Sequence, residues 1–267
     1  MSILWVTSFN KSLYEATGRH LINTFENYTS DKLLIGGEDL DAAIFTSRRI
    51  FYYDLKKSKL LTTWLKTHED IIPLTLGGKA SPCNCPDPYA RSERDHKKGC
   101  YHTWFNRNMS RWFRKIATLH FALLGINQGK SLGIDNNKYL IWIDSDCEFL
   151  RPTSFDFIDN IAKDYDVCFM KSKKRRVMEA GFIIYNLEKN GGVFLEKLFK
   201  YYMYDFLHLI RWDDSYVIQK LLFTKDFKSL DIAFDTSGHN DVIMHSLVGK
   251  HIMHHKGTHG RKLGLMK

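Results

Sequence analysis

The sequence predicts an α/β domain with a mixed, mostly parallel central sheet flanked by helices. Short runs rich in apolar residues and β-formers alternate with longer amphipathic segments, the order expected for strands joined by crossover helices. Hydrophobic residues make up 44% and aromatic residues 14% of the 267 positions, enough for a sizeable core. The chain shows neither an internal repeat nor a linker, so residues 1–267 are predicted to form one domain.

Individual elements follow from local patterns. The first strand is expected at 3–8 (ILWVTS), where a continuous apolar run suits burial on both faces. The run YLIWI at 139–143 is the most apolar in the chain and predicts a buried strand that ends at Asp144. The other expected strands are 32–36, 166–170, 181–185 and 231–234, and the expected helices are 12–28, one from near Met109, about 191–209, and 212–222. A mainly helical, aromatic-rich region is expected over 41–75.

Residues 77–103 interrupt this pattern. Gly, Pro and charged residues concentrate there, so we expect a long loop inserted into the domain. Thiols and imidazoles at this density can build a structural zinc site, and the candidate ligands are Cys83, Cys85, His96 and Cys100. The alternative is a loop with unpaired thiols, because the spacing differs from that of a standard zinc finger.

Charge and hydropathy restrict the class of protein less than the motifs do. The net charge of +9 suits a nucleic-acid-binding protein, and equally an enzyme that binds polyphosphates. No stretch approaches the roughly 20 apolar residues of a membrane span, and the N-terminus lacks the basic region of a secretory signal. We therefore expect the protein in the cytoplasm, or in the host cytoplasm if the gene is viral.

Paired aspartates follow the most apolar strand. Ligands of open α/β sheets bind beyond the carboxyl ends of strands, where Asp144 and Asp146 are expected. Side chains two positions apart on an extended segment point the same way, so one ion could contact both carboxylates. Oxygen ligands suit Mg²⁺ or Mn²⁺, which commonly bridge to substrate phosphates. The alternative is an acidic turn, where Asp is common.

Two other segments carry groups suited to a donor molecule. Arg111 and Lys115 are four residues apart on a predicted helix, so both could clamp a diphosphate from one helix face. Gly181 at the start of a strand would let a ligand approach the backbone, with Glu179 and Asn186 available to sugar hydroxyls.

The segment that opens the helix at 212–222 is acidic. Trp212 precedes Asp213 and Asp214, of which one would cap the helix or favour its dipole. The remaining carboxylate could accept a proton from an acceptor hydroxyl or orient it.

The C-terminal segment is rich in histidine and cations. His254 is a candidate third ligand beside the two carboxylates of an Mn²⁺ site. Gly257, with Lys256 and Lys262, could cradle a pyrophosphate by backbone contacts and charge. The alternative is a basic tail without fixed structure.

Together, and in this order, these features resemble the GT-A class of nucleotide-sugar glycosyltransferases. The segments TSFNKSLY, RWFRK, LIWIDSD, EAGFIIYN, WDDS and HHKGTHGRK are similar to motifs of a little-characterised set of phage, algal-virus and bacterial GT-A proteins. The match covers nearly the whole chain except the Cys-containing insertion. The pattern His254…Gly257…Lys262 also resembles the His-x-x-Gly-x-x-Lys signature of the glycogenin and lipopolysaccharide galactosyltransferase group, with a longer spacing to the lysine.

The resemblance implies a single GT-A, Rossmann-like domain that moves a sugar from a nucleoside-diphosphate sugar, with UDP favoured, to a glycan or other hydroxyl acceptor. Asp144, Asp146 and His254 would hold the Mn²⁺ or Mg²⁺ that stabilises the leaving diphosphate. The other implied roles are diphosphate contacts for Arg111, Lys115, Lys256 and Lys262, nucleoside contacts for Thr7 and Ser8, and contacts with the anomeric carbon or acceptor for Glu179, Asp213 and Asp214.

Three other functions remain open from the sequence. A nucleic-acid-binding module with a zinc loop and no catalysis would explain the basic charge, but leaves the paired aspartates unexplained. A glycosyltransferase that acts on hydroxylated DNA bases would combine both sets of features. A nucleotidyl- or phosphotransferase could use the same metal motif.

Overall fold

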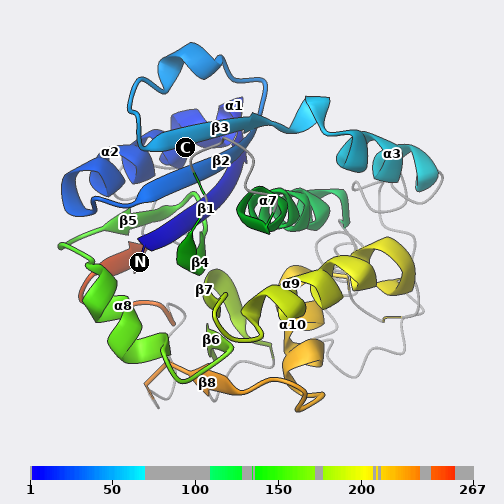
Figure 1. The fold of residues 1–267 in the computed structure, drawn as a ribbon. Helices are drawn as coiled ribbons and strands as arrows, with labels where there is room; N and C mark the ends of the chain where they lie inside the picture. The colour runs from blue at the N-terminus through cyan, green and yellow to red at the C-terminus, as the bar shows by residue number, and fades with distance from the viewer. Residues whose placement is uncertain are drawn as a thin grey trace, which may run out of the picture.

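A mixed seven-stranded sheet forms the centre of the molecule. The computed structural model describes residues 2–69, 109–127, 134, 136–171, 177–206, 209, 212–234 and 242–255. Within these ranges the strand order is β3-β2-β1-β4-β7-β6-β8 (Figure 1). The strands are β1 (Ser2–Asn10), β2 (Lys32–Glu38), β3 (Ile50–Asp54), β4 (Asn137–Ile143), β6 (Val167–Met170), β7 (Glu179–Asn186) and β8 (Ser229–Asp231). A separate two-stranded sheet pairs β5 (Cys147–Phe149) with β9 (Ile252–His254).

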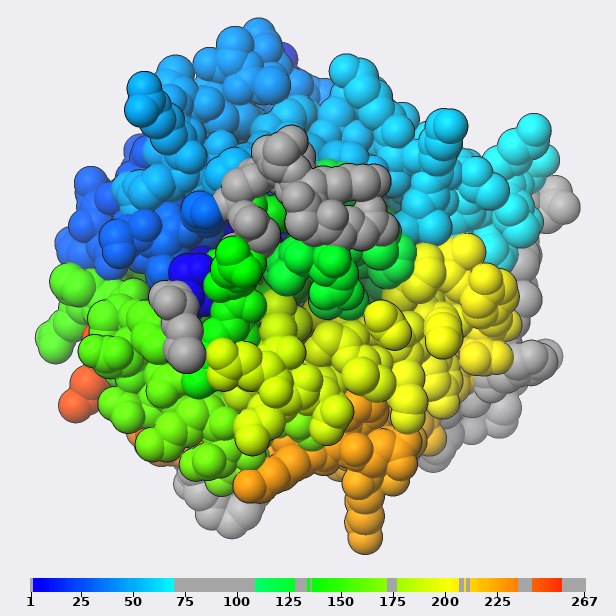
Figure 2. All heavy atoms as spheres, viewed as in Figure 1, coloured from blue at the N-terminus to red at the C-terminus, as the bar shows by residue number. Residues whose placement is uncertain are grey.

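Helices cover both faces of the large sheet, which confirms the predicted α/β class. On one face lie α1 (Lys11–Leu13), α2 (Arg19–Tyr28) and α8 (Phe155–Ala162), and on the other lie α3 (Lys59–Thr67), α7 (Met109–Asn127), α9 (Gly191–Lys200) and α10 (Asp214–Leu222). In the space-filling view, α7 lies between the N-terminal segments and the segments of α9 and α10 (Figure 2). No helix in the described ranges is both long enough and apolar enough to span a membrane.

Strand direction decides which residues share an edge of the sheet. β1 is parallel to both β2 and β4, whereas β7 is antiparallel to β4 and β6. The carboxyl end of β4 therefore adjoins the amino end of β7, and Ile143 pairs with Phe182. Residues that follow β4 and residues that open β7 consequently lie at the same edge.

The core has two parts, one on each face of the sheet. Leu4 and Val6 of β1 belong to the part that packs against α7, while Ile3 and Trp5 belong to the part that packs against α2. All four side chains are fully buried, as the continuous apolar run predicts for a central strand.

Close packing of α7 on the sheet requires glycine in β2. A Cβ added to Gly36 would lie 2.2 Å from Thr118 Oγ1 in α7, well inside van der Waals contact. The glycine therefore lets α7 pack close to β2.

Some expected elements differ from the observed ones. The region 41–75 contains β3 as well as α3, so its mainly helical prediction was wrong for 50–54 (IFYYD), where aromatic and β-branched residues pair with β2. The late strand lies at Ser229–Asp231 instead of 231–234, and α9 ends at Lys200, followed by a π-helical turn. β5 and β9 are too short to show a periodic pattern. The insertion at 77–103 lies outside the described residues.

Candidate active site

Asp144 and Glu179 lie at the same edge of the sheet. Asp144 directly follows β4, and its N–H donates to the carbonyl of Gly181 at 2.8 Å. Glu179 opens β7 with only 3% of its surface exposed, and its Oε1 accepts the Gly181 N–H at 3.0 Å. The antiparallel pairing of β4 with β7 thus places two carboxylates on either side of one glycine.

Trp142 orients the Asp144 carboxylate. The Trp142 indole N–H donates to Asp144 Oδ1 at 2.7 Å. The two residues are two positions apart at the end of β4, so their side chains leave the same face of the sheet. Asp144 Oδ1 also lies 3.5 Å from the Lys115 Nζ, which approaches from α7.

Lys115 is a buried cation that joins three elements. Its Nζ donates to Asp214 Oδ2 in α10 and to the Ala180 carbonyl in β7, both at 2.6 Å, and lies 4.5 Å from the centre of the Trp142 ring. Burial alone lowers the pKa of Lys115, but Asp214, Asp144 and Glu179 together outweigh it and hold the pKa above its usual value. The amine therefore stays charged and links α7 to the carboxylates of the edge.

His254 reaches the second aspartate of the pair through the small sheet. His254 Nε2 lies 2.9 Å from Asp146 Oδ1. The β5–β9 ladder brings them together, because Cys147 pairs with His254 and the His255 N–H donates to the Asp146 carbonyl at 2.8 Å. One ligand atom each from Asp146, Cys147 and His254 lies within 4.8 Å of the others.

Glycine at position 181 keeps a small volume open between Glu179, His254 and Asp144. A Cβ at this position would lie 3.1 Å from Glu179 Oε1, 3.1 Å from His254 Cε1 and 3.2 Å from Asp144 Oδ2. Asp144 and His254 therefore border one small volume, and Asp146 lies next to His254; carboxylate oxygen and imidazole nitrogen are donors that suit Mn²⁺. These donors have the chemistry of ligands for the predicted metal, and the group whose ligand atoms lie within 4.8 Å of one another consists of Asp146, Cys147 and His254.

A cleft of about 480 Å³ opens beside this edge. It is bounded by the end of β1, the first turns of α7, the end of β4 and the start of α10. Its lining residues are Ser8, Phe9, Asn10, Leu13, Glu38, Leu55, Ser110, Arg111, Trp112, Arg114, Lys115, Trp142, Asp144, Ser145, Asp146 and Asp214. The structure therefore brings together Ser8, Arg111, Lys115, Asp144, Asp146 and Asp214 from the sequence prediction.

Other predicted site residues lie away from the cleft lining. Thr7 is fully buried, and its Oγ1 has no hydrogen-bond partner among the described residues. Asn186 is at the opposite end of β7 from Glu179, and its amide donates to the Ala162 carbonyl at 3.1 Å. A strand of eight residues cannot place both of its ends at one site.

Trp212 and Asp213 mainly shape the start of α10. The Trp212 indole N–H donates to the Leu209 carbonyl at 2.9 Å, and Asp213 caps the helix by accepting the Tyr216 N–H at 3.3 Å. Only the next residue, Asp214, reaches the cleft. Lys256, Gly257 and Lys262, like the four candidate zinc ligands of the insertion, lie outside the described residues.

The sequence prediction did not include Trp142 and Cys147 in the site. Trp142 could have been predicted, because a side chain two positions before Asp144 points to the same face of the sheet and its indole N–H can reach the carboxylate. Cys147 gave no such signal, because its place in the apolar segment CEFL is typical of a core thiol, and only the pairing with His254 brings it near the aspartate.

The fold of the chain is similar to those of solved glycosyltransferase structures. A glycosyltransferase involved in the glycosylation of the major capsid of PBCV-1 aligns over 100% of both chains at 9% identity, with a TM-score of 0.50. An active-site mutant of LgtC aligns over 95% of this chain and 87% of its own, at 11% identity and a TM-score of 0.50. The chain has the GT-A fold.

Other comparisons add little to this GT-A assignment. Mouse xyloside xylosyltransferase 1 aligns over 87% of this chain and 86% of its own, at 10% identity and a TM-score of 0.45. No protein-family model and no curated protein sequence matches the chain. At identities this low the likeness establishes the fold, so the activity has to be argued from the site.

Proposed function

We propose that the protein is a metal-dependent glycosyltransferase that moves a sugar from a nucleoside-diphosphate sugar, with UDP favoured, to a hydroxyl acceptor. The observation that carries this proposal is that Asp144 and His254 border the space beside Gly181 at the carboxyl end of β4, while Asp146 contacts His254. This edge is where open α/β sheets bind their ligands.

A divalent ion held by these three side chains, Mn²⁺ or Mg²⁺, would supply Lewis-acid stabilisation to the departing diphosphate. Trp142 fixes one oxygen of Asp144 by its indole hydrogen bond, which leaves Oδ2 directed at the space beside Gly181. The protein thus supplies a preset arrangement of oxygen and nitrogen ligands, which lowers the reorganisation needed on binding.

The two predicted diphosphate-binding cations have different surroundings. Lys115 is already balanced by Asp214 and Asp144, so we assign it to holding both carboxylates in place. Arg111 lines the cleft and is exposed, and its guanidinium lies 5.0 Å from the centre of the Trp112 ring. A planar guanidinium suits bidentate contact with phosphate oxygens, so we assign Arg111 to the diphosphate.

Glu179 and Asp214 are the carboxylates that we place on the sugar side. Glu179 lies across Gly181 from Asp144, so a sugar held beside the metal would meet it, and Asp214 lines the cleft while bonded to Lys115. Asp213 is occupied as a helix cap, which favours Glu179 and Asp214 over it for contact with substrate. A DNA acceptor remains a prediction from the sequence alone.

Binding and product identity test the proposal. A thermal-shift screen of UDP-, GDP- and dTDP-sugars should show stabilisation that requires Mn²⁺, because a ligand specific for the folded state raises its melting temperature by mass action. Turnover should release the nucleoside diphosphate, and Asp146→Ala should abolish it. Release of pyrophosphate would identify a nucleotidyltransferase, and full turnover by Asp146→Ala with Mn²⁺ present would overturn the metal assignment.

A further inference from the structure

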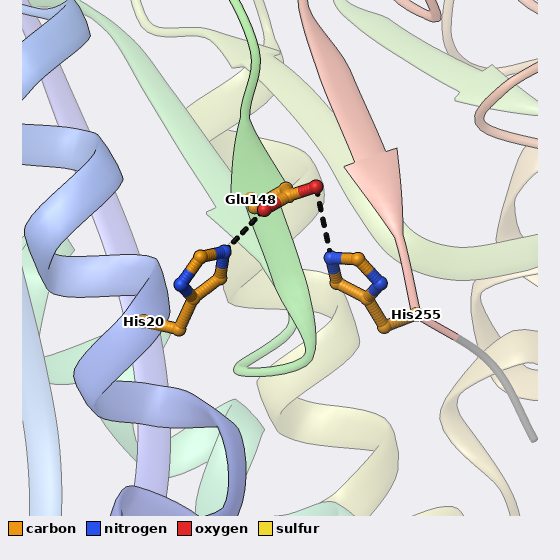
Figure 3. Close-up of side chains that lie close together, drawn as sticks. All are labelled: His20, Glu148 and His255. Carbon is orange, nitrogen blue, oxygen red and sulfur yellow. Dashed lines mark hydrogen bonds and ion pairs between the residues drawn. The ribbon is translucent and has the colours of Figure 1, made fainter. Parts of the chain in front are cut away.

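A second group of metal-ligand side chains lies on the small sheet, outside the cleft. His20 comes from α2, Glu148 from β5 and His255 from the residue after β9, and the three side chains point toward one another (Figure 3). Glu148 Oε2 contacts His20 Nε2, and Glu148 Oε1 lies 3.0 Å from His255 Nε2. One ligand atom of each residue lies within 4.8 Å of the other two.

His255 is the residue that ordinary hydrogen bonding does not explain. The side chain is only 1% exposed, and both ring nitrogens are buried without a hydrogen-bond partner among the described residues. The 3.0 Å approach of Nε2 to Glu148 is close enough for an ion pair but lacks the alignment of a hydrogen bond. A buried polar group left unpaired costs about 1–3 kcal/mol, so this imidazole needs another ligand.

The backbone holds these side chains in position before any ligand binds. The Phe149 N–H next to Glu148 donates to Thr24 Oγ1 of α2 at 3.1 Å, and the His255 N–H donates to the Asp146 carbonyl at 2.8 Å. α2 and both strands of the small sheet are therefore fixed relative to one another around the three side chains.

We propose that His20, Glu148 and His255 form a second metal site, which binds Zn²⁺. Two imidazoles and one carboxylate are a ligand set of zinc sites that keep a fourth position for water. Tetrahedral zinc, with bonds of about 2.0–2.2 Å, holds its ligand atoms roughly 3.3–3.5 Å apart. The contacts of Glu148 with His20 and His255 are shorter than this, so the ligand atoms have to move slightly apart to bind zinc, and His20, whose side chain is 37% exposed, is the member free to move.

This site would support the one in the cleft without belonging to it. His255 directly follows His254, so zinc bound at the second site would tie the end of β9 to α2 and β5. It would thereby hold the strand that presents His254 to Asp146. The proposal concerns metal binding alone and stands whether or not the protein transfers sugars.

Zinc binding is measured on full-length protein in which the predicted insertion ligands are removed by Cys83→Ser, Cys85→Ser and Cys100→Ser. Elemental analysis after dialysis against Zn²⁺ should find one zinc per chain in this background. His20→Gln should weaken zinc binding by more than the 10–100-fold that loss of a supporting side chain costs. The matched control His251→Gln changes another histidine of the same segment, one that bonds to the Pro152 carbonyl, and should keep the zinc.

A second measurement separates this group from the site in the cleft. Co²⁺ bound by His20, Glu148 and His255 should give visible d–d bands without the near-ultraviolet charge-transfer band of a thiolate ligand. Asp146→Asn should weaken Mn²⁺ binding and leave zinc bound. Absence of zinc, equal zinc in His20→Gln, loss of zinc in Asp146→Asn, or a thiolate band that indicates Cys147 would each overturn the proposal.

Discussion

His254 Nε2 lies 2.9 Å from Asp146 Oδ1, although the two residues are 108 positions apart in the chain. The contact is made by the separate two-stranded sheet of β5 and β9, whose strand β5 follows β4 in the chain. Strand pairing fixes the backbone of His254 beside the carboxylate and buries its side chain, which favours a metal-ligand role over a chance surface contact.

Replacement of His254 by glutamine should therefore weaken Mn²⁺ binding. We expect a loss of at least about 100-fold in affinity, because a direct ligand contributes more than a supporting side chain. Titration of free Mn²⁺ by electron paramagnetic resonance measures the affinity directly. His68→Gln, which changes a histidine bonded to the Trp64 carbonyl in α3, is the control and should bind Mn²⁺ normally. An unchanged affinity in His254→Gln would remove His254 from the metal site.

Lys115→Met should destabilise the fold by about 3–5 kcal/mol, because it leaves the buried Asp214 carboxylate without its cation. The pKa of Lys115 is raised, so its stabilising effect is fully present below the unfolded value of about 10.4 and is lost as the pH rises through the folded value. Urea denaturation at pH 7 measures the free energy of unfolding.

Two further variants test the cause of that loss. The double variant Lys115→Met/Asp214→Leu removes both charges and should recover part of the stability. Lys56→Met alters an exposed pair with Asp39 and should leave the unfolding midpoint unchanged. A single variant Lys115→Met as stable as the unaltered protein would show that the pair does not hold α7 to α10.

The sequence predicts the central strands and the position of Asp144 and Asp146 after β4 well, because their signals are local. YLIWI is apolar enough to mark β4, and Asp144 and Asp146 follow it directly, so position alone indicates the site edge. β3 could not be predicted from the sequence, because the strand is short, aromatic and half-exposed at the edge of the sheet. It also lies within a region whose overall pattern favours helices.

Contacts that depend on strand direction could not be predicted in the same way. Glu179 and Asn186 belong to one motif, yet the antiparallel direction of β7 places only Glu179 at the site edge. His20, Glu148 and His255 come from three elements with no common sequence pattern, and only the packing of α2 on β5 brings them together.

Trp142→Phe should remove the hydrogen bond that orients Asp144 while keeping the aromatic packing of β4. Phenylalanine keeps an aromatic ring beside the Lys115 amine but removes the indole N–H that donates to Asp144 Oδ1. We expect a stability loss of about 1.5–3 kcal/mol, typical of a hydrogen bond to a charged group, and Mn²⁺ affinity lowered about 10–100-fold. Differential scanning calorimetry and Mn²⁺ titration measure the two effects. Unaltered Mn²⁺ affinity would show that the indole does not position the carboxylate.

Gly181→Ala should block the metal site while the protein stays folded. The added methyl group would lie 3.1–3.2 Å from Glu179 Oε1, His254 Cε1 and Asp144 Oδ2, so these three groups must move apart. Crowding of this kind costs roughly 1–3 kcal/mol and should abolish stabilisation by Mn²⁺ and a sugar nucleotide. The control Gly192→Ala in α9 places its methyl group 3.5 Å from Leu123 Cδ1 of α7, an ordinary van der Waals contact, and should stabilise the fold by about 0.5–1 kcal/mol. Thermal shifts of both variants with and without ligand decide the matter, and normal ligand stabilisation of Gly181→Ala would show that the ion and donor bind elsewhere.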